Sequence, residues 1–273
     1  MKFVHLLTLA AVAQANAKYT ISRTLFAADA RGPAVAVQTL SNGATGERVE
    51  VLESWGGKLE RVSLRHAAPL GRGGSSKPPR DIIASRCASF KTCNASALRS
   101  QGAPGALLIP FANRVAYGAY SFGGKRHFLS ADNSTVSHGF LIQGRPMQLM
   151  AKSVAASSAT LVLGARFNGS DMGYPFVVSV NVSYSLSAAG LSVTVRARND
   201  NADGSAAPFM AGCHPYFKLL HGGFEKARLE LDRCSQWNRQ AQLPIQVRII
   251  RMRWCYRCCW CCRWRCSSCR CSC

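Results

Sequence analysis

The sequence lacks the apolar periodicity of an amphipathic helix. No stretch of ten or more residues repeats its apolar side chains every 3.6 positions, so the fold is expected to be built from strands. The signatures G-x-S-x-G and H-E-x-x-H, the P-loop and the dinucleotide fingerprint are also absent. The sequence therefore contains no local motif that would indicate a serine hydrolase, a zinc protease or a nucleotide-binding enzyme. Any catalytic chemistry must rest on residues that are dispersed along the chain.

Acidic residues are scarce. The chain has 13 Asp and Glu against 34 Lys and Arg, which gives a formal net charge of +21. Outside the C-terminal tail the basic residues stand singly, with no Lys/Arg block and no basic stripe interleaved with aromatics. This pattern indicates a solvated basic surface and predicts no nucleic-acid partner. Weak attraction to acidic polysaccharide is a further expectation.

Residues 1–17 have the order of a secretory leader. Lys2 precedes an apolar run over residues 3–13, and Ala15-Asn16-Ala17 provides small residues in the pattern of a signal peptidase site. The run is too short to span a membrane, so no membrane partner is expected. The mature chain is expected to begin at Lys18 and to be secreted; a buried N-terminal helix is the alternative.

Extracellular chemistry is also suggested by glycosylation sequons and by two closely spaced cysteines. Four N-x-S/T sequons predict glycosylation at Asn94, Asn133, Asn168 and Asn181. Cys87 and Cys93 are disulfide candidates in an oxidising compartment, although two free thiols remain the alternative.

The C-terminal tail, residues 246–273, has an unusual composition. Its last 23 residues hold nine of the 13 cysteines, mixed with Trp and Arg in no repeating order and without Lys, Asp, Glu or His. The C-x2-C spacings Cys255–Cys258 and Cys266–Cys269 raise a zinc site as an alternative. Because Cys, Trp, Arg and Ser share related codons, we interpret the tail as a frameshift product and expect no metal site.

The body of the chain has the alternation of half-buried strands. Apolar residues occupy every second position over 178–186, a turn is expected at Ala189-Gly190, and the alternation resumes over 191–197, which predicts a hairpin. Residues 159–167 and 56–66 read as further strands. Many short strands at close spacing predict an all-β antiparallel sandwich or barrel.

Three dispersed motifs contain residues suited to binding and proton transfer. Asn113 and Arg114 lie in PFANRV, His138 precedes a glycine in SHGF, and His214 lies in HPYFKL. In this order, between about residues 50 and 243, the motifs resemble the aldose 1-epimerase (galactose mutarotase) family. Taken singly, each could be structural: an ion-paired arginine, a turn histidine and a core histidine held by Pro215 and Tyr216.

The resemblance implies a fold and a reaction. The fold would be a large antiparallel β-sandwich, the galactose mutarotase-like supersandwich, over residues 18–245. The reaction would interconvert the α and β anomers of a free aldose, galactose or glucose, by acid/base ring opening and reclosure without metal or cofactor. His214 would be the acid, and Asn113, Arg114 and His138 would bind the sugar hydroxyls.

One part of the family pattern is missing. The family's catalytic base is a glutamate far along the chain, whereas only Glu225, Glu230 and Asp232 follow His214, all in a segment that the family uses as framework. We therefore expect the sandwich to be incomplete at the C-terminus and the chain as written to be inactive. A non-catalytic carbohydrate-binding protein and a hexose-6-phosphate epimerase are the alternatives, and the sequence gives no oligomeric state.

Overall fold

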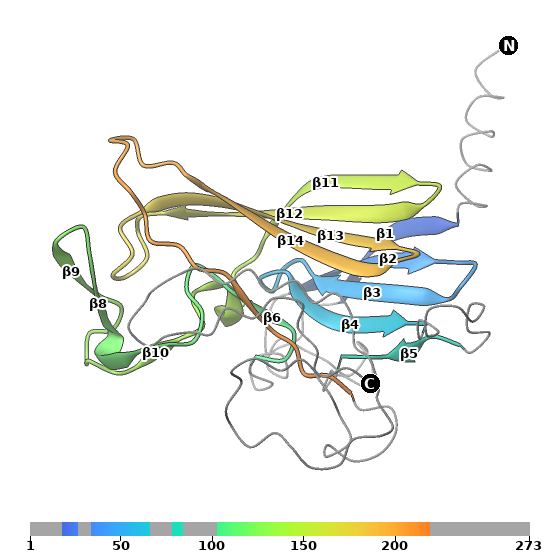
Figure 1. Ribbon diagram of the computed structural model, residues 1–273, viewed down its shortest axis with the longest axis horizontal. Coiled ribbons are helices and arrows are strands. Elements are labelled where there is room, and N and C mark those ends of the chain that lie inside the picture. Colours follow the sequence, from blue (N-terminus) through green and yellow to red (C-terminus); the bar gives the residue numbers. More distant parts are fainter. Residues whose placement is uncertain (1–17, 27–33, 66–77, 84–102, 219–273) are drawn as a thin grey trace, which may run out of the picture. The chain divides into compact units, whose positions relative to one another are not determined.

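The structure, a computed structural model, describes residues 18–26, 34–65, 78–83 and 103–218 (Figure 1). Strands dominate these residues, and the two helices among them are short 3-10 turns, η1 (Ala116–Gly118) and η2 (Leu141–Gln143). The all-β prediction is therefore confirmed. None of the helices described is long and apolar enough to cross a membrane. Several predicted features lie outside the described residues: the leader 1–17, Cys87, Cys93, Asn94, the boundary at 245 and the tail 246–273.

The first sheet contains five antiparallel strands in the order of the chain (Figure 1). They are β1 (Tyr19–Phe26), β2 (Val35–Asn42), β3 (Glu47–Leu52), β4 (Lys58–Leu64) and β5 (Arg80–Asp81). The strand expected over residues 56–66 is β4. A register shift between Glu50 and Val51, where β3 pairs with β4, marks a bulge in this sheet.

The second sheet contains four antiparallel strands, β11 to β14 (Figure 1). They are β11 (Gln148–Ala155), β12 (Ser158–Asn168), β13 (Val177–Ser187) and β14 (Gly190–Asn199). The predicted hairpin is confirmed, because β13 and β14 pair from Val178 opposite Asn199 to Ser187 opposite Gly190. Burial along β13 alternates between neighbours, as the sequence pattern requires for a strand with one face in the core.

Short strand pairs connect and flank these sheets. They are β6 (Ala106–Leu108) with β15 (Gly212–His214), β7 (Arg114–Val115) with β10 (Val136–Ser137), and β8 (Ala119–Phe122) with β9 (Lys125–Phe128). All three pairs are antiparallel. The first two pairs carry the residues that the sequence singled out.

The core lies between the inner faces of the two large sheets. Strands β1 and β2 contact β12, and β2 also contacts β13. Leu40 and Val49 from one sheet and Leu163 and Val182 from the other have no exposed surface and belong to one hydrophobic cluster. Burying such a side chain contributes about 1.5–3 kcal/mol. Two antiparallel sheets packed face to face through one core confirm the predicted β-sandwich.

Candidate active site

His214 is the last residue of β15, and the buried strand β6 holds its backbone. It lies opposite Ala106 in the β15–β6 pair, and its carbonyl accepts a hydrogen bond from the Gly105 amide at 2.8 Å. Gly105 has φ +72°, and a Cβ there would lie 1.9 Å from the Leu59 carbonyl oxygen. Only glycine permits this approach of the β6 turn to β4. His214 is thus attached by main-chain contacts to the buried part of the fold.

Arg114 and His138 are brought together by the two-residue strands β7 and β10. Arg114 pairs with Ser137, the neighbour of His138, and the His138 amide donates a hydrogen bond to the Asn113 carbonyl at 2.9 Å. Asn113 and His138 both have left-handed backbones, with φ of 59° and 70°. Asparagine and histidine are among the residues that tolerate this region best. The two left-handed residues therefore lie side by side at one end of the β7–β10 pair.

Gly139 fixes the path of the chain directly after His138. It has φ +72° and forms a bridge with Ile109, the residue that follows β6. A Cβ on Gly139 would lie 2.2 Å from the Ile109 carbonyl oxygen. Because Ile109 continues from β6, the strand that holds His214, the backbone of His138 is tied to the same segment as that of His214.

The two predicted histidines consequently face each other. Their ring centroids are 5.2 Å apart and the rings meet edge to face at 87°. The His214 ring also stacks on Tyr216, at a centroid distance of 5.2 Å and an interplanar angle of 12°. His214 is half-buried and Tyr216 is exposed, so His214 is not a core histidine enclosed by its neighbours.

His138 is in an environment that favours its neutral form. Partial removal from water, followed by the nearby charges of His214 and Arg114, lowers the pKa of His138 below its ordinary value. Its Nδ1 atom is buried and has no hydrogen-bond partner in the part of the chain that the structure describes. A neutral imidazole has one donor and one acceptor nitrogen. His138 can therefore accept a hydrogen bond from a ligand hydroxyl or donate one to it.

Asn113 and Arg114 lie at the open side of this group. Both are exposed, and Arg114 is near enough to act on the charge of His138. A guanidinium offers donors in a fixed planar fork. Together the four residues provide a half-buried proton-transfer group, a neutral imidazole and exposed hydrogen-bonding side chains. That combination suits a small polyhydroxylated ligand better than an apolar one.

No glutamate that the structure describes is placed to act as a base opposite His214. All four lie on β3, on β4 or in the turn between them, and each already binds another group. The pairs are Glu47 with Thr45 and Arg65, Glu50 with Arg48 and Arg61, Glu53 with Arg23 and Gln38, and Glu60 with Lys58. Glu225 and Glu230 lie outside the described residues.

The structure adds two features that sequence reasoning did not identify. One is the contribution of backbone strain at Asn113 and His138, which no hydrophobic pattern records. The other is a cluster of arginines around Asp200 on the outer face of β12 to β14. The alternation of Arg196 and Arg198 on the polar face of a predicted strand was the signal for it.

Comparison with known proteins agrees with this architecture. A curated relative, the uncharacterized protein YihR of Escherichia coli K12, is 36% identical over 116 residues, which cover 41% of this chain and 35% of that protein. The chain is thus matched to about a third of the length of this relative.

Two solved structures share the fold. A galactose 1-epimerase from Lactobacillus acidophilus has a TM-score of 0.55 at 20% identity, with 73% of this chain and 53% of that one covered. A galactose mutarotase-like protein from Clostridium acetobutylicum has a TM-score of 0.55 at 17% identity, with 73% and 54% covered. The chain spans about half the length of each.

The family itself is shown by the sequence. A sequence model described as aldose 1-epimerase matches residues 88–249, more than half of the chain. This stretch includes Asn113, Arg114, His138 and His214, the residues on which the resemblance was based. The Lactobacillus acidophilus structure described above shares the antiparallel β architecture of this chain. The chain belongs to the aldose 1-epimerase family.

Proposed function

We propose that the site formed by Asn113, Arg114, His138 and His214 binds a free hexose, galactose or glucose, with His214 in the position of the family's acid catalyst. The observation that carries the proposal is the edge-to-face contact of His138 and His214, 5.2 Å apart, beside Arg114. These residues are separated by up to about a hundred positions in the sequence, and a purely structural role would not require them to meet.

The reaction of the family moves two protons and changes no oxidation state. A base removes the proton of the anomeric hydroxyl while an acid protonates the ring oxygen, the ring opens to the aldehyde, and the chain recloses on the other face. His214 would supply the proton to the ring oxygen and recover it on closure. Arg114, Asn113 and neutral His138 would hold the hydroxyls while the chain turns. These steps require neither a metal nor an organic cofactor.

We propose further that the chain as written binds hexose without accelerating mutarotation. Its described glutamates are engaged on β3 and β4, and Glu225 and Glu230 belong to a segment that the family uses as framework. An acid without its partner base cannot complete both proton transfers. On this hypothesis the chain is a carbohydrate-binding member of the family. An active epimerase would instead accelerate mutarotation.

The experiment separates binding from turnover. Calorimetry with galactose and glucose measures binding, and polarimetry on freshly dissolved α anomers measures mutarotation. We expect saturable binding, reduced by Arg114→Gln and His138→Gln, together with a mutarotation rate equal to that without protein. His127→Gln on β9 is the matched control, because it removes a histidine outside the His138–His214 contact. Acceleration that His214→Gln abolishes would establish the enzyme and overturn the binding-only reading.

Absence of hexose binding would overturn the proposed site. Hexose 6-phosphate, titrated in parallel, tests the sugar-phosphate alternative: tight binding of the phosphate alone would transfer the proposal to that substrate class.

We also propose that the protein is secreted and glycosylated. The leader-like residues 1–17 support secretion, and the exposure of Asn133 and Asn168 leaves these two acceptors accessible. Expression in eukaryotic cells, with and without residues 1–17, should give secretion only of the longer form, and digestion with an N-glycosidase should lower its apparent mass. Retention of the longer form inside the cell would contradict the proposal.

A further inference from the structure

The outer face of the β11–β14 sheet carries short polar side chains and a group of arginines. In the pairing of β12, β13 and β14, Arg166 lies opposite Ser179, and Ser179 lies opposite Arg198. The next row on the same face contains Asn181 opposite Arg196. Side chains in register across a sheet point to the same face, so the three arginines share one surface. All three are exposed.

A groove crosses this surface beside the arginines. Its volume is about 690 Å³, and it is lined by the three arginines, by the polar side chains of Gln148 and Asn181, and by Met150. Gly164 forms part of its floor, where a Cβ would approach the Met150 side chain to 2.8 Å. This volume is within the range of small-molecule sites, and no aromatic side chain lines the groove. It therefore offers no stacking platform for nucleic-acid bases.

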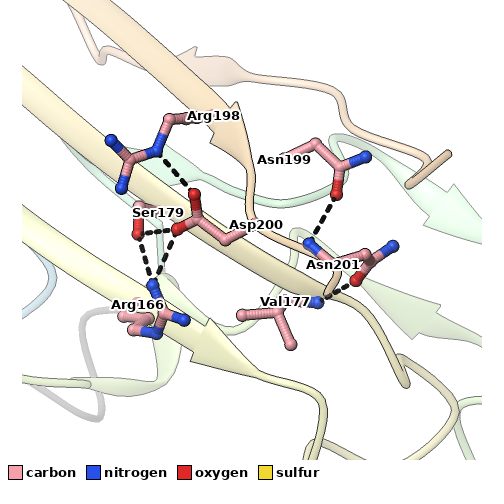
Figure 2. Close-up of polar contacts among 7 residues, drawn as sticks. All are labelled: Arg166, Val177, Ser179, Arg198, Asn199, Asp200 and Asn201. Atoms are coloured by element: carbon pink, nitrogen blue, oxygen red, sulfur yellow. Dashed lines mark hydrogen bonds and ion pairs between the residues drawn. The ribbon is translucent and has the colours of Figure 1, made fainter. Parts of the chain in front are cut away.

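One carboxylate lies among these arginines. Figure 2 shows Asp200 between Arg166 and Arg198: Arg166 Nη1 lies 2.7 Å from Asp200 Oδ2 and Arg198 Nε lies 2.5 Å from Oδ1. The Ser179 hydroxyl also donates to Asp200. Hydrogen bonds from Arg198 and Ser179, together with the two positive charges, lower the pKa of Asp200 to about 2. Asp200 therefore stays ionised and orders two guanidinium groups at the edge of the groove.

The positive charge of the cluster is not balanced. Two guanidinium groups pair with one carboxylate, and the third arginine of this surface, Arg196, has no ion-pair partner among the described residues. Strand geometry places the Cα atoms of Arg196 and Arg198 about 7 Å apart, and those of Arg166 and Arg198 about 10 Å apart. Asp200 already neutralises one side of Arg166 and of Arg198, so a single small anion would add a contact mainly to Arg196. An extended ligand with negative charges repeated at intervals of several ångströms can contact Arg196 and the remaining donors of the other two guanidinium groups.

We propose that this groove binds an acidic polysaccharide, with carboxylates on successive sugars contacting Arg196, Arg198 and Arg166 in turn. Guanidinium matches the planar carboxylate in two-point hydrogen bonding, and Asn181 and Gln148 provide partners for the sugar hydroxyls. The formal net charge of +21 adds long-range attraction to such a chain. The binding is separate from the hexose site and requires no catalysis.

The test titrates the full chain with an oligomer of galacturonate and, as the neutral match, with the same oligomer as its methyl ester. Calorimetry should detect binding of the acid form alone, weakening as salt is added. Arg196→Gln should weaken binding about threefold and the Arg166→Gln, Arg196→Gln double variant about tenfold, as expected for exposed charge pairs. Asp200→Asn should strengthen it about threefold, because it frees two guanidinium groups. His214→Gln should leave it unchanged.

Arg126→Gln, on the exposed β9 strand, is the matched control for loss of one positive charge. If Arg126→Gln weakened binding as much as Arg196→Gln does, the groove would not be the binding site, since net charge alone would then explain binding. Equal binding of the methyl ester, or weaker binding by Asp200→Asn, would also overturn the proposal. Sedimentation tests a further occupant, a second copy of the chain. If the protein forms a dimer that does not bind the oligomer, and if Arg196→Gln dissociates that dimer, the second copy is the occupant and the proposal is overturned.

Discussion

Gly139→Ala tests whether the backbone contact behind His138 holds the site together. Gly139 has φ +72°, and an added Cβ would lie 2.2 Å from the Ile109 carbonyl oxygen. That oxygen also accepts the hydrogen bond of the Phe140 amide at 2.8 Å. The new methyl group therefore cannot be accommodated by rotating a side chain. The backbone that carries His138 must move away from the segment that continues into β6.

The size of the effect follows from a matched glycine. Gly123, in the β8–β9 turn, has φ +58° and no atom within 4 Å of an added Cβ. Gly123→Ala should cost about 1 kcal/mol or less, since left-handed strain of about 1–2 kcal/mol is partly offset by the stiffer unfolded chain. Gly139→Ala adds a forced displacement of backbone, which raises the expected loss to about 3 kcal/mol.

Urea unfolding of both variants, followed by far-ultraviolet circular dichroism, measures the difference in free energy of unfolding. Under conditions where Gly139→Ala is still folded, calorimetry should also show weaker hexose binding than Gly123→Ala, because His138 has moved. Equal destabilisation by the two substitutions would refute the reasoning. It would mean that the approach of Gly139 to Ile109 does not constrain the site.

Three further predictions concern packing and pH. Leu163→Ala should lower the free energy of unfolding by about 3 kcal/mol, because Leu163 is fully buried. Val162→Ala, on the opposite face of β12, should lower it by under about 1 kcal/mol. Equal decreases in denaturant unfolding would contradict the register of β12. The pKa of Asp200 is lowered from 3.8 to about 2 in the folded protein. The stability that Asp200 provides is therefore present above pH 3.8 and is lost as the pH falls toward 2. Asp200→Asn should flatten the decrease in the free energy of unfolding between pH 3.8 and 2. The pKa of His138 is also lowered, so folding favours its neutral form. The free energy of unfolding should therefore decrease as the pH falls below 6.5. His138→Gln, measured in the same acid titration, should reduce this decrease.

The long strands of the second sheet were predictable because their sequence records their burial. One face of β13 enters the core and the other meets solvent, so Val178, Val180 and Val182 alternate with Ser179 and Asn181. Such a period of two specifies both the strand and its register. The hairpin between β13 and β14 followed from the same pattern and from a glycine at its turn.

The arrangement of the site was not predictable in the same way. Strands β7 and β10 have two residues each, too few for any period to be read, and their geometry depends on left-handed Asn113 and His138. The contact of His138 with His214 arises only when β15 pairs with β6 across about a hundred residues of chain. Motif order suggested that the residues belong together, whereas their distance and orientation come from tertiary pairing.

The arginines of β14 have a consequence for solubility. β14 is the last strand of its sheet among the residues described, so one side of its backbone has no neighbouring strand there. An open edge is a template on which another chain can add a strand, and charged side chains are one of the means by which proteins prevent this. Two molecules that joined through β14 in a register bringing Arg196 and Arg198 opposite their own copies would place like charges directly across the new ladder, which destabilises it. Within the described part of the chain, the charges that line the groove therefore also oppose such pairing of a second molecule along β14.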